Sequence, residues 1–178
     1  SDLAFEVLAR GYRDEPSLAL ELVERLAIAS GSERLVGGQM EDLLAEGRPP
    51  DSDTLSYIHS NKTAAMIEAS LFLGFRVSDR GENLELQLLV GQAGHALGLA
   101  FQAVDDLLDV TSSSKELGKD ASHDQAAGKM TWVQMLGLDQ ARDLARKHTE
   151  EALAAIRELG GSNEFLLELA SHMLRRRY

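Results

Sequence analysis

The sequence predicts an all-α fold, and three observations support this. Apolar residues recur at helical spacing along the chain, as at Leu18, Leu22 and Leu26. No segment alternates apolar and polar residues in the way typical of a half-buried strand. The chain has 178 residues, 44% of them hydrophobic, which suffices to bury one sizeable core. We therefore expect a single all-α unit over residues 1–178.

Glycine, proline and polar clusters mark the ends of the expected helices. These helices cover about 3–11, 16–26, 32–47, 54–74, 84–110, 130–159 and 163–176. We expect the sequence to begin partway along the first of these helices. Pro49-Pro50 prevents the third helix from continuing. Asp51, Ser52 and Asp53 are candidate N-caps for the fourth. We expect polar connections at 77–83 and from 111 to 128, and a potential break at Gly137-Leu138-Asp139 in the long helix near the C-terminus.

One uncharged stretch is long enough to span a bilayer, but its composition favours a buried helix. Residues 86–104 carry no formal charge, yet they include three glutamines, a histidine and three glycines, and they run directly into Asp105. The glycines at 91, 94 and 98 share one helical face, where a neighbouring backbone can approach closely. We expect a central core helix and no membrane span.

The charge balance restricts the possible partners. The chain carries 29 acidic and 18 basic residues, a formal net charge of −11, so its average field repels nucleic acid and anionic membranes. It has no cysteine, which excludes disulfides, thiolate metal sites and cysteine nucleophiles. Its first residues carry charges and lack the apolar run of a signal peptide. We expect a cytoplasmic protein without a nucleic-acid partner.

Three aspartates in VDDLLDV are the most specific local feature. Asp105 and Asp109 are four residues apart and share a helical face, with Asp106 about 100° around the helix. They lie in the last turns of the expected helix, where the helix dipole already disfavours negative charge. Carboxylates together with substrate phosphates and water are the usual ligands of Mg²⁺. From spacing alone, a solvated acidic patch explains the same residues equally well.

Lysines beside glycines favour the metal interpretation. Lys119 and Lys129 each follow a glycine in the loop after the aspartates, and such lysines suit phosphate oxygens. Lys62, followed by Thr63, lies early in a helix of small and apolar residues. By itself, Lys62 could equally be a surface lysine. Metal ligands followed by cations fit a metal–diphosphate site.

Six segments together resemble one family. They are GGQMEDL (37–43), HSNKTAAMI (59–67), GLAFQAVDDLLDV (98–110), LGKDASHD (117–124), GKMT (128–131) and LGLDQAR (136–142). In this order, and over nearly the whole chain, they resemble the trans-isoprenyl diphosphate synthases, or polyprenyl synthetases, which include farnesyl and geranylgeranyl diphosphate synthases. The lysine–threonine and GKD segments match these synthases better than the related terpene cyclases.

The resemblance implies a fold and a reaction. The fold is the all-α isoprenoid synthase bundle, with a central cavity between long helices. The reaction is an Mg²⁺-dependent prenyl transfer, in which an allylic diphosphate (dimethylallyl, geranyl or farnesyl) condenses with isopentenyl diphosphate and releases diphosphate. Such chemistry requires stabilisation of the charge on the leaving group.

The resemblance also implies roles for individual residues. The metal ligands would be Asp105, Asp106 and Asp109, the second aspartate-rich motif of the family. The diphosphate would be held by Lys62, Lys119, Lys129 and Gln39, with Asp42 on the same helix as Gln39. The catalytic residues would be Lys62, Thr63, Gln102 and Lys119, with Thr63 and Gln102 lining the reaction centre. Gln102 could instead be a hydrogen-bonded core residue, and no pair of histidines has convincing ligand spacing.

The match is incomplete at its N-terminal side. Family members carry a first aspartate-rich motif and basic residues for isopentenyl diphosphate, and this sequence has neither. We expect the C-terminal portion of a synthase, lacking the N-terminal helices, with little or no condensation activity alone. Such a chain would form a homodimer or pair with the missing N-terminal portion. The alternatives are a non-catalytic or regulatory subunit of a heteromeric prenyl synthase, and an all-α interaction module.

Overall fold

Helices account for all regular secondary structure in the described part of the chain. The computed structural model describes residues 2–117 and 130–174. Its elements are α1 (Asp2–Gly11), α2 (Pro16–Ser30), α3 (Leu35–Ala45), α4 (Ser52–Ile58), the π-helix η1 (His59–Ala64), α5 (Ala65–Arg76), α6 (Leu84–Leu117), α7 (Trp132–Leu136), α8 (Leu138–Glu158) and α9 (Glu164–Leu174). The all-α prediction is confirmed.

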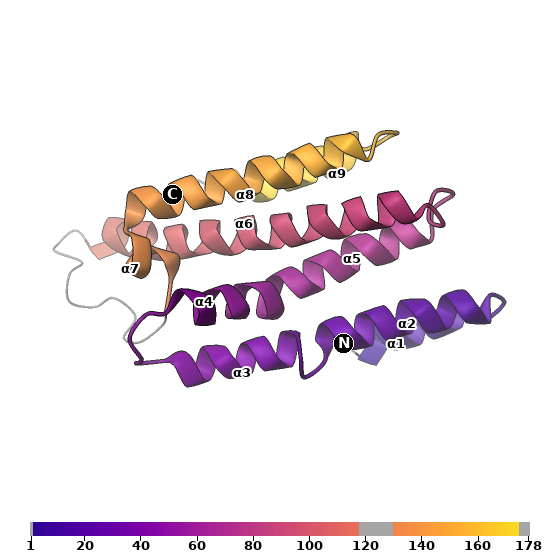
Figure 1. Ribbon diagram of the computed structural model, residues 1–178, viewed down its shortest axis with the longest axis horizontal. Helices are drawn as coiled ribbons and strands as arrows, with labels where there is room; N and C mark the ends of the chain where they lie inside the picture. Colours follow the sequence, from indigo (N-terminus) through magenta and orange to yellow (C-terminus); the bar gives the residue numbers. More distant parts are fainter. Residues whose placement is uncertain (1, 118–129, 175–178) are drawn as a thin grey trace.

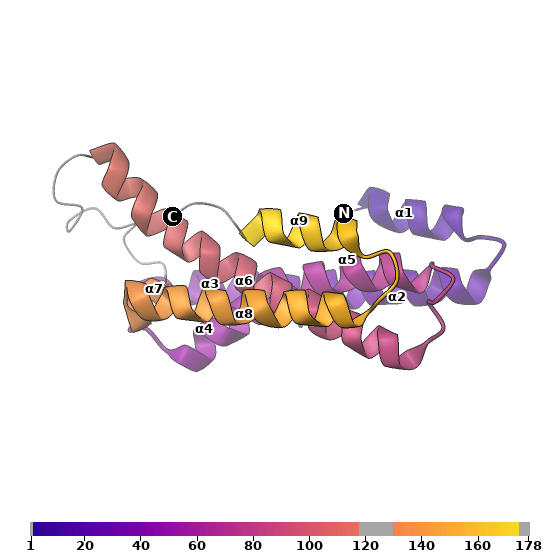
Figure 2. The same ribbon diagram turned by 90° about the horizontal axis from the view of Figure 1, so that it is seen from above.

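The long helix α6 lies at the centre of the arrangement. Figure 1 shows α8 along one side of α6 and the continuous rod α4–η1–α5 along the other, with α2 and α3 beyond the rod. Helix α1 packs on α2, and α9 packs on α6 and α8. Seen from above in Figure 2, α6 crosses α8 obliquely and its C-terminal end projects away from the neighbouring helices. The π-helix η1 contacts both α3 and α6, and α6 also contacts α7.

Local signals fix several helix ends as the sequence predicted. Pro16 occupies the first turn of α2, where its missing N–H costs nothing. The Asp51 carboxylate accepts a hydrogen bond from the backbone N–H of Thr54 at 2.8 Å and caps α4. Gly137 has a φ of 79°, which favours glycine, and it separates α7 from α8.

The structure differs from the expected helices most at α6 and at η1. Helix α6 continues to Leu117, beyond the end expected at residue 110, and no glycine or proline interrupts the chain between these points. The helix expected over 54–74 instead changes to π geometry at His59 and returns to α geometry at Ala65. No helix among the described residues is long and apolar enough to cross a membrane, as expected.

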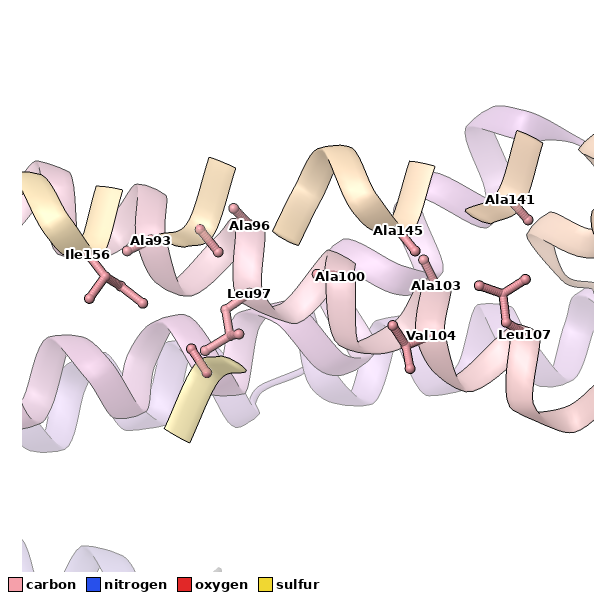
Figure 3. Close-up of a cluster of buried hydrophobic side chains, with 12 residues drawn as sticks. Ala93, Ala96, Leu97, Ala100, Ala103, Val104, Leu107, Ala141, Ala145 and Ile156 are labelled. Atoms are coloured by element: carbon pink, nitrogen blue, oxygen red, sulfur yellow. The ribbon is translucent and has the colours of Figure 1, made fainter. Parts of the chain in front are cut away.

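The main core is a contact of small side chains between α6 and α8, which we call the alanine seam. Figure 3 shows Ala103 of α6 and Ala145 of α8 pointing toward each other, and Leu107 of α6 pointing toward Ala141 of α8. Its buried members are Ala93, Ala96, Leu97, Ala100, Ala103, Val104 and Leu107 of α6, Ala141, Ala145, Ala152 and Ile156 of α8, and Ala170 of α9. Small residues allow the helices to approach closely, and burial of apolar area stabilises them by roughly 25 cal/mol per Å². The seam holds α6 in place relative to the rest of the molecule.

Candidate functional site

The π-helix presents two of the predicted site residues. Lys62 and Thr63 lie within η1, which widens the helical rod for a single stretch of six residues. Just before them, the buried Asn61 side chain donates to the Tyr57 carbonyl oxygen at 2.9 Å. A side chain that hydrogen-bonds to a backbone carbonyl within the helix is one cause of local helix distortion. Single π turns of this kind occur often at functional sites.

Two glycines allow neighbouring helices to contact η1 closely. A Cβ at Gly38 of α3 would lie 2.9 Å from the Lys62 Cα, and a Cβ at Gly98 of α6 would lie 2.6 Å from the Ala64 Cβ. Both distances are shorter than real side chains adopt, so any larger residue would push the backbones apart. A third glycine, Gly94, meets the Glu68 backbone in the same way, whereas Gly91 faces nearly open space. The expected glycine face is thus confirmed at two of its three positions.

Lys62 is held by a carboxylate from α3. Its Nζ lies 2.5 Å from Asp42 Oδ2, and both side chains are partly buried. Asp42 thereby fixes the ammonium group at the edge of the junction between α3 and η1. A lysine held in this position presents a localised positive charge that suits phosphate oxygens.

A chain of hydrogen bonds connects η1 to α6 and α7. The Thr63 hydroxyl donates to Gln102 Oε1 at 2.9 Å, and Gln102 Nε2 donates to Asp106 Oδ1 at 3.4 Å. The other carboxylate oxygen, Asp106 Oδ2, accepts from the backbone N–H of Trp132 at 3.0 Å. The His59 Nε2 lies 3.8 Å from the same oxygen. We call Thr63, Gln102, Asp106 and Trp132 the polar junction.

The three aspartates of α6 occupy different environments. Asp106 is fully buried, Asp105 is partly buried and Asp109 is exposed. Asp105 and Asp109 are four residues apart and share a face that water reaches. Two accessible carboxylates fit the ligand set that Mg²⁺ takes with waters and phosphates. Among the described residues no cluster of three or more acidic or histidine side chains could hold a metal by itself.

Of the predicted diphosphate-binding residues, Lys62 and Gln39 lie in the described part of the chain. Gln39 is exposed on α3, three residues before Asp42. Lys119 and Lys129 lie outside the described residues. The structure therefore joins Thr63, the neighbour of Lys62 in the chain, to Gln102 of α6, and Asp105 lies on the following turn of that helix.

A cleft of about 960 Å³ lies beside the site, between α2, α5 and α6. Ala65, two residues after Thr63, contributes to its lining. Its apolar lining includes Ile28 and Phe72, together with Leu88 near the start of α6. The cleft thus extends from the neighbourhood of η1 along the helices with a largely apolar wall.

Charged groups gather at one part of this cleft. Arg34 of the α2–α3 connection donates to Glu68 Oε2 at 3.2 Å, and His95 Nδ1 lies 3.8 Å from the same oxygen. The interaction with His95 lowers the pKa of Glu68 below its ordinary value, and the positive charge of Arg34 acts in the same direction. Partial burial opposes this effect. The Arg25 guanidinium lies 4.3 Å above the Phe72 ring.

Sequence reasoning missed several members of the site. His59 is buried, and its ring packs edge-on against Trp132 with the centroids 5.8 Å apart. The signal for His59 was its position at the start of the segment that carries Lys62. The sequence indicated Trp132 less clearly, because this residue joins the site through its backbone N–H, a group that every residue except proline has. The ion pair between Asp42 and Lys62 joins two residues that were identified separately.

Comparison with known proteins assigns the family. The polyprenyl synthetase model matches residues 3–166. The chain is 37% identical over 177 residues to geranylgeranyl pyrophosphate synthase 7, chloroplastic, of Arabidopsis thaliana, in a match that covers 97% of this chain and 50% of that protein. The chain spans about half or less of the length of its curated relatives. Several of these relatives are named as chloroplastic, so the cytoplasmic location stays a prediction.

Solved structures agree with this assignment. The FPP/GFPP synthase of Zymomonas mobilis superposes with a TM-score of 0.80 at 31% identity, over 97% of this chain and 57% of that one. The geranyltransferase of Helicobacter pylori, solved in complex with magnesium and isoprenyl diphosphate, gives 0.77 at 31% identity, over 97% and 56%. The expected isoprenyl diphosphate synthase fold is therefore confirmed. The chain belongs to the polyprenyl synthetase family.

Proposed function

We propose that this chain contributes one side of the active site of a prenyltransferase. The reaction would condense an allylic diphosphate, such as dimethylallyl, geranyl or farnesyl diphosphate, with isopentenyl diphosphate. The observation that carries the proposal is the hydrogen bond between Thr63 and Gln102, which joins the residue after Lys62 to the central helix one turn before Asp105. A cation, two neutral hydrogen-bonding groups and a partly buried carboxylate are suited to hold and ionise an allylic diphosphate.

The diphosphate group would bind at the α3–η1 edge. Lys62 exchanges its ion pair with Asp42 for contacts with phosphate oxygens, and Lys119 and Lys129 are proposed to join it. Asp105 and Asp109 would hold Mg²⁺, which neutralises negative charge on the departing diphosphate when it is bound. Gln39, on the same helix as Asp42, is proposed to contact the diphosphate from α3.

Bond cleavage and bond formation would occur next to the polar junction. The bond between the allylic carbon and the diphosphate oxygen breaks, and diphosphate leaves with the electron pair. The double bond of isopentenyl diphosphate then attacks the allylic carbon. The new cation forms a double bond by transferring a proton to the released diphosphate. Thr63 and Gln102 place oxygen atoms near this centre, where they stabilise positive charge as it develops.

The isoprenoid chain would lie in the apolar cleft. Ala65 brings the cleft close to Thr63, and Ile28, Phe72 and Leu88 provide apolar surface farther along it. Leu88 is 71% exposed, so it can be replaced without disturbing the core. Leu88→Ser should weaken binding of geranyl diphosphate and leave binding of inorganic diphosphate unchanged. Equal weakening of both ligands would contradict a tail site in the cleft.

Titration calorimetry with inorganic diphosphate and Mg²⁺ tests the head-group site. Lys62→Ala should raise the dissociation constant about tenfold, which corresponds to about 1.4 kcal/mol. The matched control is Lys147→Ala on α8, which removes an exposed lysine whose ion pair with Glu151 spans 3.9 Å. The control should bind like the native chain. Equal affinities for the native chain and the Lys62 variant would refute the site.

We also propose self-association. Exposed apolar side chains line α3, among them Val36, Met40 and Leu43. Burial of such a surface in a dimer would remove it from water. Sedimentation velocity should give a species of twice the chain mass, and a concentration-independent monomer would contradict this.

A further inference from the structure

We infer that Asp106 is a positioning residue, which orients the Gln102 amide and anchors the start of α7, and that it does not ligate metal. This assignment departs from the sequence-based grouping of Asp106 with Asp105 and Asp109. The part of this inference that concerns metal and diphosphate binding rests on the proposed function, and the rest does not. Its core is a set of contacts within the polar junction.

Burial separates Asp106 from its neighbours. The Asp106 residue is 0% exposed, whereas Asp105 is partly buried and Asp109 is exposed. Asp106 is rotated around α6 by about 100° from Asp105 and by about 60° from Asp109, so it lies to one side of the face that those two residues share. That side faces η1 and the start of α7. Mg²⁺ ordinarily retains several waters, and a fully enclosed carboxylate offers no room for them.

Hydrogen-bond chemistry links Asp106 to the orientation of Gln102. The NH₂ group of Gln102 faces Asp106 and donates to its Oδ1 at 3.4 Å. The Gln102 carbonyl oxygen is then directed to Thr63, from which it accepts a hydrogen bond at 2.9 Å. Without Asp106, the two orientations of the amide would be similar in energy. Asp106 therefore selects the orientation that presents an oxygen near the proposed reaction centre.

The second carboxylate oxygen anchors the backbone at Trp132. The N–H of Trp132 is in the first turn of α7, where a helix offers it no acceptor of its own. Asp106 Oδ2 accepts this N–H at 3.0 Å, and His59 adds an edge-on contact with the indole ring. One side chain thus connects the position of α7 to the orientation of the Gln102 amide.

The single tryptophan gives a readout that requires no ligand. Trp132 is the only tryptophan in the chain, so its fluorescence reports the anchoring of α7. Asp106→Ala should shift its emission to longer wavelength and lower its anisotropy, while the matched variant Asp105→Ala should leave both unchanged. Native-like Trp132 fluorescence in the folded Asp106 variant would overturn the anchoring role.

A second experiment measures Mg²⁺ binding by the same two variants, Asp105→Ala and Asp106→Ala. With inorganic diphosphate as the ligand, Asp105→Ala should raise the Mg²⁺ concentration at half-saturation by about tenfold or more, as expected for loss of a ligand. Asp106→Ala should leave that concentration nearly unchanged. An equal increase in both variants would make Asp106 a ligand. Failure of the native chain to bind diphosphate would refute the proposed function but leave the fluorescence arm intact.

An amide–carboxylate exchange keeps the inference testable if Asp106→Ala does not fold. Gln102→Glu alone puts two carboxylates in contact, and Asp106→Asn alone puts two NH₂ groups in contact unless the Gln102 amide reverses. In the double variant, the carboxylate introduced at position 102 can accept from both Thr63 and the new amide, whose oxygen can accept from Trp132. The urea midpoint of the double variant should exceed those of both single variants. If the double variant is less stable than each of the two single variants, Asp106 does not orient the Gln102 amide.

Discussion

The two sides of α6 are held against their neighbours by different kinds of contact. Toward α8, the alanine seam is built from apolar residues, with Ala100 and Ala103 fully buried. Toward η1 and α7, the same helix buries Gln102 and Asp106 in a continuous set of hydrogen bonds. The seam therefore depends on side-chain volume, and the polar junction depends on the direction of donors and acceptors.

This difference separates stability from function along one helix. Apolar seams tolerate replacements that conserve volume, because dispersion and burial have no direction. A buried polar group must keep its partners, because an unsatisfied donor or acceptor costs about 1–3 kcal/mol. We therefore expect substitutions in the seam to change the free energy of unfolding with little effect on ligand affinity. Substitutions in the junction should change the free energy of unfolding and also the orientation of the groups next to the proposed reaction centre.

The largest loss of stability is expected in the seam. Ile156→Ala removes a fully buried side chain of α8 and leaves a cavity, so it should lower the free energy of unfolding by about 3 kcal/mol. Chemical denaturation measures this loss. The folded variant should bind magnesium diphosphate like the native chain, and weaker binding would show that the seam and the site are coupled.

The next effect is expected where α6 meets η1. Gly98→Ala introduces a Cβ against the Ala64 backbone and should destabilise the chain by about 2 kcal/mol. Gly91→Ala is the matched control on the same helix, because the nearest atom that its Cβ would meet is a Glu68 carboxylate oxygen at 4.0 Å. That control should be neutral or stabilising by about 0.5 kcal/mol. Equal destabilisation by both variants would show that the close approach at Gly98 is unimportant.

A smaller effect is expected for the hydroxyl of the junction. Thr63→Val preserves shape and removes the donor to Gln102, so it should cost about 1 kcal/mol. Thr149→Val on α8 removes a hydroxyl that donates to the Ala145 carbonyl oxygen one turn earlier, and it should cost less. The comparison of their unfolding free energies measures the junction contact. A larger loss at Thr149 would contradict the importance of the junction.

The smallest effect is expected from Glu68 at the cleft. Its pKa is lowered in the folded state, so its contribution to stability is present above the ordinary value of 4.5 and is lost as the pH falls through the folded pKa. The contribution of this half-buried group should be about 0.5 kcal/mol. Glu68→Gln should therefore flatten the decline of stability below pH 4.5. If the stability of Glu68→Gln falls at low pH as steeply as that of the native chain, the proposed role of the Arg34 and His95 contacts is refuted.

Much of the fold could be predicted because its signals are local. Asp51 caps a helix and Gly137 breaks one through contacts within a few residues. The change to π geometry at η1 could not be predicted, because it depends on Asn61 and on glycines that approach from α3 and α6. Gly91 was expected to meet a neighbouring backbone, and only the structure separates it from Gly94.

The candidate site divides in the same way. The spacing of Asp105 and Asp109 predicted a common face, because helical geometry alone determines it. The burial of Asp106 could not be predicted, because it depends on Trp132, which is 26 residues further along the chain. The ion pair between Lys62 and Asp42 likewise joins two helices whose relative position only the folded structure defines.

One measurement tests the separation of stability from function most directly. Magnesium diphosphate is titrated into Ile156→Ala and Lys62→Ala under conditions in which both variants are folded. The seam variant should bind with native affinity despite its lower stability, and the Lys62 variant should bind about tenfold more weakly. Native affinity in the Lys62 variant, or equal weakening in both, would contradict the account.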